Sequence, residues 1–181
     1  MSSETEKRLY LPDNLELDNP FWTFSLDVWR SPKAREGLLA CQDEHALRVS
    51  QLLFAAWLAK QGRLLQSAPV DEISGLAQWQ HQMVDCLRNC RRQLPLSGQV
   101  CDTLKRYIQR AELLAEQLEI GWLYARHNYL SKAAKIDEDI LMVNFIYYTR
   151  EALGIAPLAP LPAKVMTQLQ SLVVSFGHLT S

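Results

Sequence analysis

Residues 42–45, Gln-Asp-Glu-His, are the most compact group of chemically active side chains in this sequence. They place the carboxylates of Asp43 and Glu44 beside the imidazole of His45. Carboxylate and imidazole together can transfer a proton or bind a hard metal ion. The same residues suit a helix start, because Asp43 can cap a helix beginning near residue 46 and Glu44 fits its first turn. We expect the capping role, with a site at these three residues as the alternative.

A metal site at this cluster would need further ligands, which Glu112, Glu116 and Glu119 are best placed to supply. Dinuclear carboxylate bundles carry a Glu-x-x-His pair on two helices, and this sequence contains no such pair. The three glutamates lie opposite the leucines of their predicted helix, so we expect them to face solvent. No metal and no other cofactor is therefore predicted.

The cysteines offer a second possible metal site. Cys86 and Cys90 lie four residues apart on one predicted helix, and Cys101 follows a turn. Structural zinc sites usually combine two closely spaced ligand pairs separated by a short finger, which is not this arrangement. We expect these three cysteines and Cys41 to be reduced, small and buried apolar side chains.

Basic residues gather around the turn between the fourth and fifth predicted helices. Positive charge at the end of a helix complements the helix dipole, which explains much of the cluster without a ligand. The cluster could instead bind a phosphate, an acidic partner or RNA, but no recognised nucleic-acid-binding module accompanies it. Nucleic acid is therefore not favoured as a partner. The residues of this basic patch are Arg88, Arg91, Arg92, Lys105, Arg106 and Arg110.

Sequence motifs for nucleophilic catalysis and phosphate binding do not occur. There is no G-x-S-x-G, no G-x-x-x-x-G-K-[ST] and no G-x-G-x-x-G. The acidic run 137–139 lacks the second acidic motif that a magnesium-diphosphate site would need. Asn144, Tyr147 and Tyr148 interrupt an apolar helix and are expected to be core groups whose polar tips find partners. A catalytic function is not favoured.

Composition limits the class of protein. The chain has 181 residues, of which 48% are hydrophobic and 22% charged, and its net charge is −1. One folded domain is expected at this size, without the overall field that draws proteins to nucleic acid or anionic lipid. The polar N-terminal residues do not resemble a secretory signal, and the longest apolar run, 52–59, is too short to span a membrane. We expect a cytoplasmic protein without membrane contact.

Helical signals occur along most of the chain. Asn19-Pro20 and Ser31-Pro32 each place a capping residue before a proline, which predicts two helix starts. The segment 46–61 is apolar on most of its circumference, so it should be the central helix, and Gly62 should end it. Further helices are predicted over 71–94, from the turn at Gly98 to about residue 125, over 137–153 and over 162–176.

These elements predict the fold class. Every long periodic segment has the helical period, and no alternating run bounded by hairpin turns suggests a strand. We predict an all-α protein, a single compact irregular bundle of six or seven helices. Residues 1–18 are expected to form a flexible N-terminal arm and residues 19–181 one helical domain. Within that domain, a proline-rich linker at 155–162 precedes the last helix.

One ordered set of residues runs through most of the chain. It comprises Trp22 and Phe24; residues 41–45; Leu52, Leu53, Phe54, Trp57, Leu58, Ala59 and Gly62; Trp79, Leu87, Arg88, Arg91 and Arg92; and Glu112, Ala115 and Glu116. In this combination the chain resembles a family of short bacterial proteins known as domain of unknown function 2390, over about residues 20–155. The resemblance implies a small helical bacterial protein of the cytosol and carries no established activity.

Together these features predict a protein-binding or regulatory module, whose partner is another protein or a second copy of the chain. The alternative is a small enzyme or a ligand- or metal-binding protein with its site at Asp43, Glu44 and His45. A second alternative is an RNA- or ribosome-associated factor that uses the basic patch.

Overall fold

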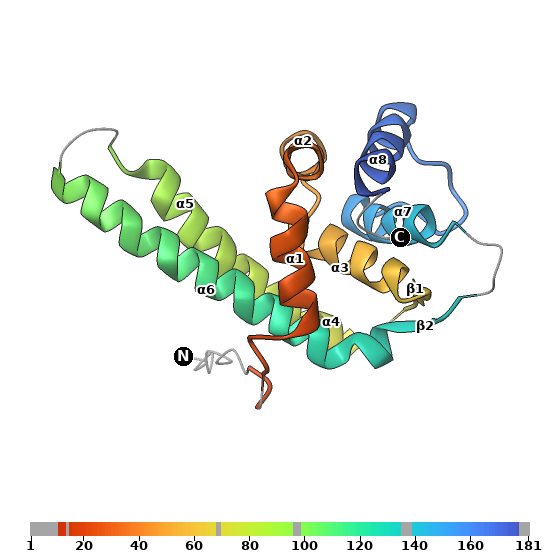
Figure 1. The fold of residues 1–181 in the computed structure, drawn as a ribbon, viewed down its shortest axis with the longest axis horizontal. Coiled ribbons are helices and arrows are strands. Elements are labelled where there is room, and N and C mark those ends of the chain that lie inside the picture. The colour runs from red at the N-terminus through yellow and green to blue at the C-terminus, as the bar shows by residue number, and fades with distance from the viewer. Residues whose placement is uncertain (1–10, 14, 68–69, 96–98, 135–138, 178–181) are drawn as a thin grey trace, which may run out of the picture.

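The structure is a computed structural model that describes residues 11–13, 15–67, 70–95, 99–134 and 139–177. It is an irregular bundle of helices, which confirms the all-α prediction (Figure 1). Two three-residue strands were not predicted. The elements are α1 (Pro20–Arg30), α2 (Pro32–His45), α3 (Val49–Lys60), β1 (Arg63–Leu65), α4 (Val70–Trp79), the π-helical turn η1 (Gln80–Val84), α5 (Asp85–Gln93), α6 (Gln99–Leu130), β2 (Ser131–Ala133), α7 (Ile140–Leu153) and α8 (Ala163–Phe176).

The first two helices begin where the sequence predicts. The Asn19 side chain accepts a hydrogen bond from the Trp22 backbone N–H at 2.8 Å, and Pro20 is the first helical residue. Ser31 also precedes a helical proline, but its side chain makes no capping hydrogen bond. For α1, both the predicted capping side chain and the proline at the helix start are therefore confirmed. For α2, only the proline is confirmed.

The boundary between α2 and α3 differs from the prediction. Ala46 does not begin a helix: it has a φ of 54° and ends α2, where the Leu47 N–H donates to the Cys41 carbonyl at 3.3 Å. The Ala46 N–H also donates to the Gln42 carbonyl at 3.0 Å, which is the bond of an αL C-cap, and the turn lets the buried Leu47 point inward. Helix α3 starts only at Val49, and its N-cap residue, Arg48, makes no side-chain capping bond. The prediction that Asp43 caps the following helix is therefore wrong, because Asp43 lies in the last turn of α2.

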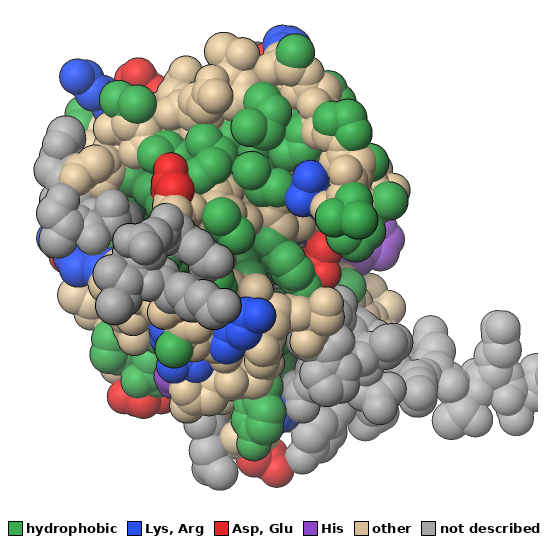
Figure 2. All heavy atoms as spheres, turned by 90° about the vertical axis from the view of Figure 1, so that its right-hand side faces the viewer, with side chains coloured by type: hydrophobic (Ala, Val, Ile, Leu, Met, Phe, Trp, Pro, Cys, Tyr) green, Lys and Arg blue, Asp and Glu red, His purple; other side chains and the backbone are tan. Residues whose placement is uncertain are grey.

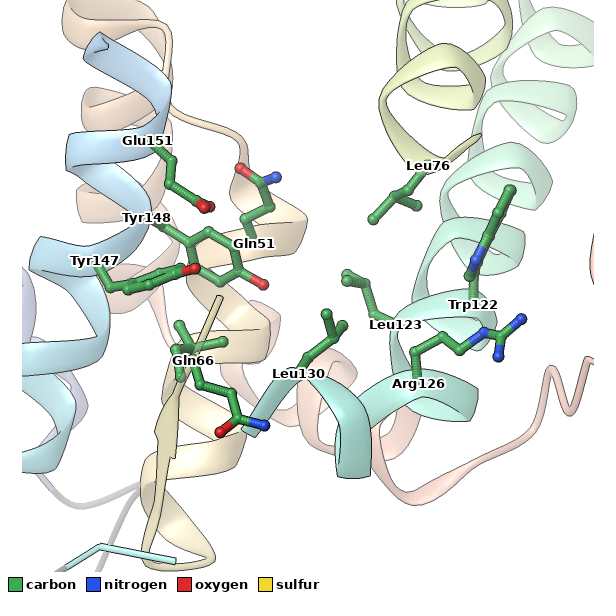
Figure 3. A pocket seen from close by; sticks show the side chains of 11 residues that line it. Gln51, Gln66, Leu76, Trp122, Leu123, Arg126, Leu130, Tyr147, Tyr148 and Glu151 are labelled. Atoms are coloured by element: carbon green, nitrogen blue, oxygen red, sulfur yellow. The ribbon is translucent and has the colours of Figure 1, made fainter. Parts of the chain in front are cut away.

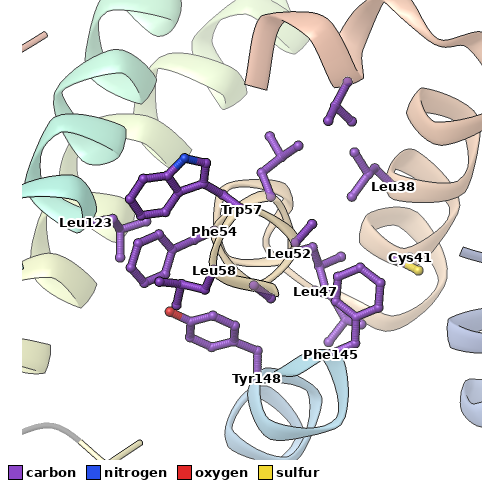
Figure 4. Close-up of a cluster of buried hydrophobic side chains, with 14 of the residues drawn as sticks. Leu38, Cys41, Leu47, Leu52, Phe54, Trp57, Leu58, Leu123, Phe145 and Tyr148 are labelled. Carbon is purple, nitrogen blue, oxygen red and sulfur yellow. The ribbon is translucent and has the colours of Figure 1, made fainter. Parts of the chain in front are cut away.

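Helix α3 is the centre of the core, as predicted (Figure 4). Every residue from Leu52 to Leu58 is buried, so almost no side of the helix meets solvent. The Trp57 ring lies 5.4 Å from the Phe21 ring and 5.7 Å from the Tyr124 ring, measured between centroids. Gly62, with a φ of 66°, follows the helix end, in agreement with its predicted role.

Helices α4, η1 and α5 form one continuous rod that packs antiparallel to α6, and the resulting hairpin projects from the body (Figure 1). The prediction that the three glutamates of α6 face solvent is wrong for two of them. Glu112 and Glu119 are buried, whereas Leu104, Tyr107 and Leu114 are exposed. The reason is that α5 presents arginines to α6, so the side of α6 that meets α5 carries carboxylates. The α6 helix also extends to Leu130, beyond the predicted end near residue 125.

The cysteine prediction is correct only for Cys41, which is buried. Cys86 and Cys90 are exposed and Cys101 is partly exposed. Arg88 and Arg91 occupy the side of α5 that meets α6, and the helical spacing places Cys86 and Cys90 on another side of this helix.

The two short strands pair antiparallel, with Arg63 opposite Ala133. The Asn144 side chain of α7 supports the ladder, because it donates to the carbonyls of Ala55 and Arg63 and accepts from the Leu65 N–H. Asn144 is fully buried and hydrogen-bonded, as predicted for a core polar group. Each strand has three residues, too few to show an alternating pattern in the sequence.

The last two helices also lie close to their predicted positions. The Asp139 side chain caps α7 by accepting from the Met142 N–H at 3.2 Å, while residues 137 and 138 fall outside the described part. Helix α8 packs against α2 and α7. Of the predicted arm, residues 1–10 and 14 are not described, and Leu11 and Leu15 pack against the core. No described helix is both long enough and apolar enough to cross a membrane.

Candidate functional site

A groove of about 820 Å³ separates the helical body from the α5–α6 hairpin. One wall consists of α1, the end of α2 and the start of α3. The other wall consists of α5 and the middle of α6. The groove contains Asp43 from the polar cluster together with Arg88, Arg91 and Arg92 from the basic patch. It therefore brings one residue of the first candidate site together with three residues of the second.

The body wall of the groove is largely apolar. Trp22, Leu26 and Trp29 follow each other at i, i+4 and i+7 along α1 and so form one stripe. Leu26 and Trp29 leave about two-fifths of their surface exposed, at 39% and 40%. Leu39 of α2 continues this surface, and Leu113 of α6 lies on the facing wall. Exposed aromatic and aliphatic side chains in a groove are typical of binding surfaces.

The hairpin wall is a network of ion pairs. Arg88 contacts Glu112 at 3.2 Å and Glu116 at 2.7 Å, and Arg91 contacts Glu112 at 2.5 Å. Burial alone would raise the pKa of Glu112, but the hydrogen bonds and charges of Arg91 and Arg88 outweigh it and lower that pKa. For Glu116, burial outweighs the charge of Arg88 and raises the pKa. Arg88 and Arg91 therefore already have carboxylate partners within the fold.

A further ion pair connects the two walls. The guanidinium of Arg48, which precedes α3, donates to the two carboxylate oxygens of Asp85 at 3.3 and 2.9 Å. Such a paired, two-bond contact fixes the relative orientation of its groups. Asp85 is the first residue of α5, so this contact ties the hairpin to the body at the inner end of the groove.

Glu119 lies in the lining of the groove and is almost entirely buried, with 2% of its surface exposed. One of its carboxylate oxygens accepts hydrogen bonds from the Ser50 hydroxyl and, at 2.5 Å, from the Gln80 amide. Burial raises the pKa of Glu119, despite these two bonds. This carboxyl group therefore favours its protonated form in the folded protein more than an exposed glutamate does.

The structure separates the three residues of the polar cluster. Glu44 pairs with Lys164 of α8 at 2.8 Å, and His45 Nε2 lies 2.8 Å from Gln168 Oε1 of the same helix. The hydrogen bond and charge of Lys164 lower the pKa of Glu44. Glu44 and His45 thus hold α8 against α2. Asp43 instead is exposed on the groove and has no hydrogen bond or ion pair among the described residues.

The basic patch is divided as well. Arg88, Arg91 and Arg92 line the groove, whereas Lys105, Arg106 and Arg110 are exposed on α6 outside its lining. The Arg106 guanidinium donates to the Thr103 hydroxyl at 3.1 Å. Within the described ranges, no hydrogen bond or ion pair involves Arg92, so its charge is available in the groove.

The carboxylates that pair with the arginines were not recognised from the sequence as functional neighbours. A signal was present: Arg88 and Arg91 are three residues apart on one helix, and Glu112, Glu116 and Glu119 follow at helical spacing on the next. Two helices joined by a short turn pack antiparallel, which brings such stripes together. In the part of the chain that the structure describes, no three His, Cys, Asp or Glu side chains are arranged to hold a metal ion.

Comparison with known proteins identifies a protein family. A family model described as "Protein of unknown function (DUF2390)" matches residues 20–123, which include α1 to α5, most of α6 and every residue that lines the groove. No curated protein and no solved structure matches the chain.

Proposed function

This chain belongs to the family of unknown function DUF2390, and we propose that it is a protein-binding module whose groove receives an amphipathic helix of a partner protein. The observation that carries this proposal is the open apolar stripe of α1 along a groove of about 820 Å³. Helix-in-groove recognition uses apolar anchors at i, i+3 or i+4, and i+7.

The shape of the apolar wall supports a helix as the bound element. The stripe of Trp22, Leu26 and Trp29 has helical spacing, so a second helix laid along it can match its side chains turn by turn. Two tryptophans are strong anchors, since tryptophan is enriched among the residues that dominate binding energy.

The available charges support a polar edge on the same partner. Asp43 on the body wall and Arg92 on the hairpin wall carry opposite charges, and neither is paired among the described residues. A partner helix with basic residues along the edge near Asp43 and acidic residues along the edge near Arg92 would complement both. Such complementarity fixes orientation and excludes other partners.

The two alternative functions have less support. A proton-transfer or metal site at Asp43, Glu44 and His45 requires the three side chains to converge, but two of them contact α8. An RNA-binding patch would use its six cations together, but Arg88 and Arg91 pair with glutamates. Of the other four, Arg92 lines the groove and Lys105, Arg106 and Arg110 lie outside it. No observation specifically favours either function.

The test uses a photo-crosslinking amino acid at Leu26 in the full chain, expressed in its own cell. The crosslinked partner segment is mapped by mass spectrometry and synthesised as a peptide, and its affinity is measured by calorimetry. We expect a segment with helical apolar spacing, and we expect Trp29→Ala to weaken its binding by about tenfold or more. Thermal unfolding checks that the variant remains folded.

Leu158→Ala provides the matched control. Leu158 is 97% exposed and lies between α7 and α8, away from the groove. Its substitution should leave peptide affinity unchanged. The proposal fails if the mapped segment lacks apolar residues at helical spacing, if Trp29→Ala binds the peptide as tightly as the wild type, or if the crosslinks lead only to RNA or to a second copy of the chain.

A further inference from the structure

A second, smaller cavity lies apart from the groove, between α3, α4, α6 and α7 and beside β1 (Figure 3). Its volume is about 50 Å³. A buried water needs roughly 10–15 Å³ of such volume, so the cavity holds about four water-sized groups. None of its lining residues belongs to the groove, so an occupant here is independent of a bound partner helix.

The interior of the cavity is apolar. Trp122 and Leu123 of α6, Leu76 of α4 and Leu65 of β1 line it and are buried, and Leu130 closes it near the end of α6. Water in such a space finds few hydrogen-bonding partners. A short alkyl chain of three or four carbons would fill it and gain the free energy of apolar burial.

Acceptor groups and aromatic rings gather on the other side. Glu151, Tyr147 and Tyr148 of α7 and Gln51 of α3 lie together on this side of the cavity (Figure 3). Tyr147 is hydrogen-bonded to Glu151, and burial raises the pKa of Tyr147 to about 12, so its hydroxyl stays neutral. Burial raises the pKa of Glu151 as well, against the bond from Tyr147. The single carboxylate thus stands beside neutral hydroxyls and ring surfaces.

The one basic side chain in the lining, Arg126, lies across the cavity from Glu151 (Figure 3). Arg126 turns its guanidinium away from Glu151 (Figure 3), and it takes part in an interaction of its own. A negatively charged ligand would meet the Glu151 carboxylate at the edge, whereas a cation would meet an opposite charge and the faces of aromatic rings, which attract cations.

We propose that this cavity binds a short-chain alkylammonium compound, with its alkyl chain between Trp122, Leu123 and Leu130 and its ammonium group on the Glu151 carboxylate beside the two tyrosines. The volume sets the chain length near four carbons. The ammonium donates to Glu151, and its positive charge favours the ionised carboxylate that burial alone disfavours.

The test compares three probes of similar size, n-butylammonium, 1-butanol and butyrate, on the full-length protein by saturation-transfer NMR and titration. We expect n-butylammonium to bind most tightly, 1-butanol more weakly, and butyrate not to bind. Glu151→Gln keeps the size of the side chain and removes its charge. It should reduce the affinity for n-butylammonium about tenfold or more while leaving that for 1-butanol unchanged.

Two further variants complete the experiment. Leu130→Phe fills part of the cavity and should weaken both n-butylammonium and 1-butanol. Glu36→Gln removes an exposed carboxylate of α2 outside the cavity and should change neither. Circular dichroism checks that each variant is folded. The proposal is overturned if no probe binds, if the alcohol binds as tightly as the ammonium, if butyrate binds best, or if Glu151→Gln binds n-butylammonium like the wild type.

Discussion

Trp57 is the residue whose loss should damage the fold most directly. It is buried in α3 and its ring contacts those of Phe21, Phe54 and Tyr124. Trp57→Ala should lower the free energy of unfolding by about 3–5 kcal/mol, because it leaves a cavity among rings that cannot collapse onto it. Urea denaturation measures this change.

Lys105→Ala is the surface control for that measurement. Lys105 is exposed on α6, so its replacement should change the free energy of unfolding by less than about 0.5 kcal/mol. Equal losses in the two variants would contradict the central position of α3.

For the loss of the Asp43 side chain, the structure predicts a change in stability opposite to the one expected for a capping residue. It lies in the last turn of α2, where the negative end of the helix dipole disfavours a carboxylate. Asp43→Ala should therefore leave stability unchanged or increase it by up to about 0.5 kcal/mol, whereas loss of a cap costs about 1 kcal/mol. Thermal unfolding at low salt distinguishes the two, and a clear loss of stability would contradict the structure.

Glu119 should make stability fall as the pH rises. Its raised pKa means that the folded protein holds this proton over a pH range, beginning at the ordinary value of 4.5, in which the unfolded chain has released it. The Glu119→Gln variant should lack this fall in stability. Its stability relative to the wild type should therefore increase as the pH rises. Urea midpoints from about pH 4 to pH 8 measure the effect.

Glu112 is the opposite control for the pH series. Its pKa is lowered, so its contribution to stability is present above 4.5 and is lost as the pH falls below that value. The Glu112→Gln variant should therefore be less stable than the wild type at neutral pH, and this difference should disappear in acid. Parallel pH curves for the wild type and Glu119→Gln would rule out a shifted Glu119.

At the scale of elements, the sequence predicts the helices well and the orientation of their faces less well. Asn19-Pro20 and the apolar segment of α3 are strong local signals, and both are confirmed. The buried face of α6 depends instead on what α5 brings to it. Periodicity assigns polar side chains to solvent, and that assumption fails where Arg88 and Arg91 meet Glu112 and Glu116.

The candidate site shows the same limit. The sequence identified Asp43 and Arg92 as chemically interesting, but it could not show that both line one groove, because they lie on different helices. It also grouped Asp43 with Glu44 and His45, although successive positions on a helix point in different directions. Contacts such as His45 with Gln168, 123 residues apart, have no local signal.

The pairing of α5 with α6 gives a prediction at this scale. Arg88→Leu removes the partner of Glu116 and one partner of Glu112, so it should destabilise the protein by about 2 kcal/mol at neutral pH. Arg92→Leu, four residues further on at an exposed position, should change stability by less than about 0.5 kcal/mol. Urea denaturation of both variants measures these changes. Equal losses of stability would mean that the ion pairs do not stabilise the packing of α5 against α6.

For the whole molecule, the far-UV circular dichroism spectrum should be dominated by helix, with a negligible strand signal. Among the described residues, only β1 and β2 are strands, and each has three residues. A spectrum with a substantial strand component would contradict the fold.

The molecule also presents two unlike sides. The groove lies on the hairpin side, while the side that carries α7 and α8 shows gathered hydrophobic side chains (Figure 2). Val143, Leu158 and Val174 are among the exposed apolar residues of those elements and the segment between them. Controls for groove binding can therefore be taken from this second side, where a change of similar chemistry leaves the groove intact.

The β1–β2 ladder has a kinetic consequence. The Arg63–Ser131 contact joins residues 68 positions apart, whereas the Arg88–Glu116 and Trp79–Ala115 contacts of the hairpin join residues 28 and 36 apart. Closing a long flexible loop costs more chain entropy than closing a shorter one, and a folded hairpin brings the ends of this loop together beforehand. We therefore infer that during folding the α5–α6 hairpin forms before the two strands pair at its base.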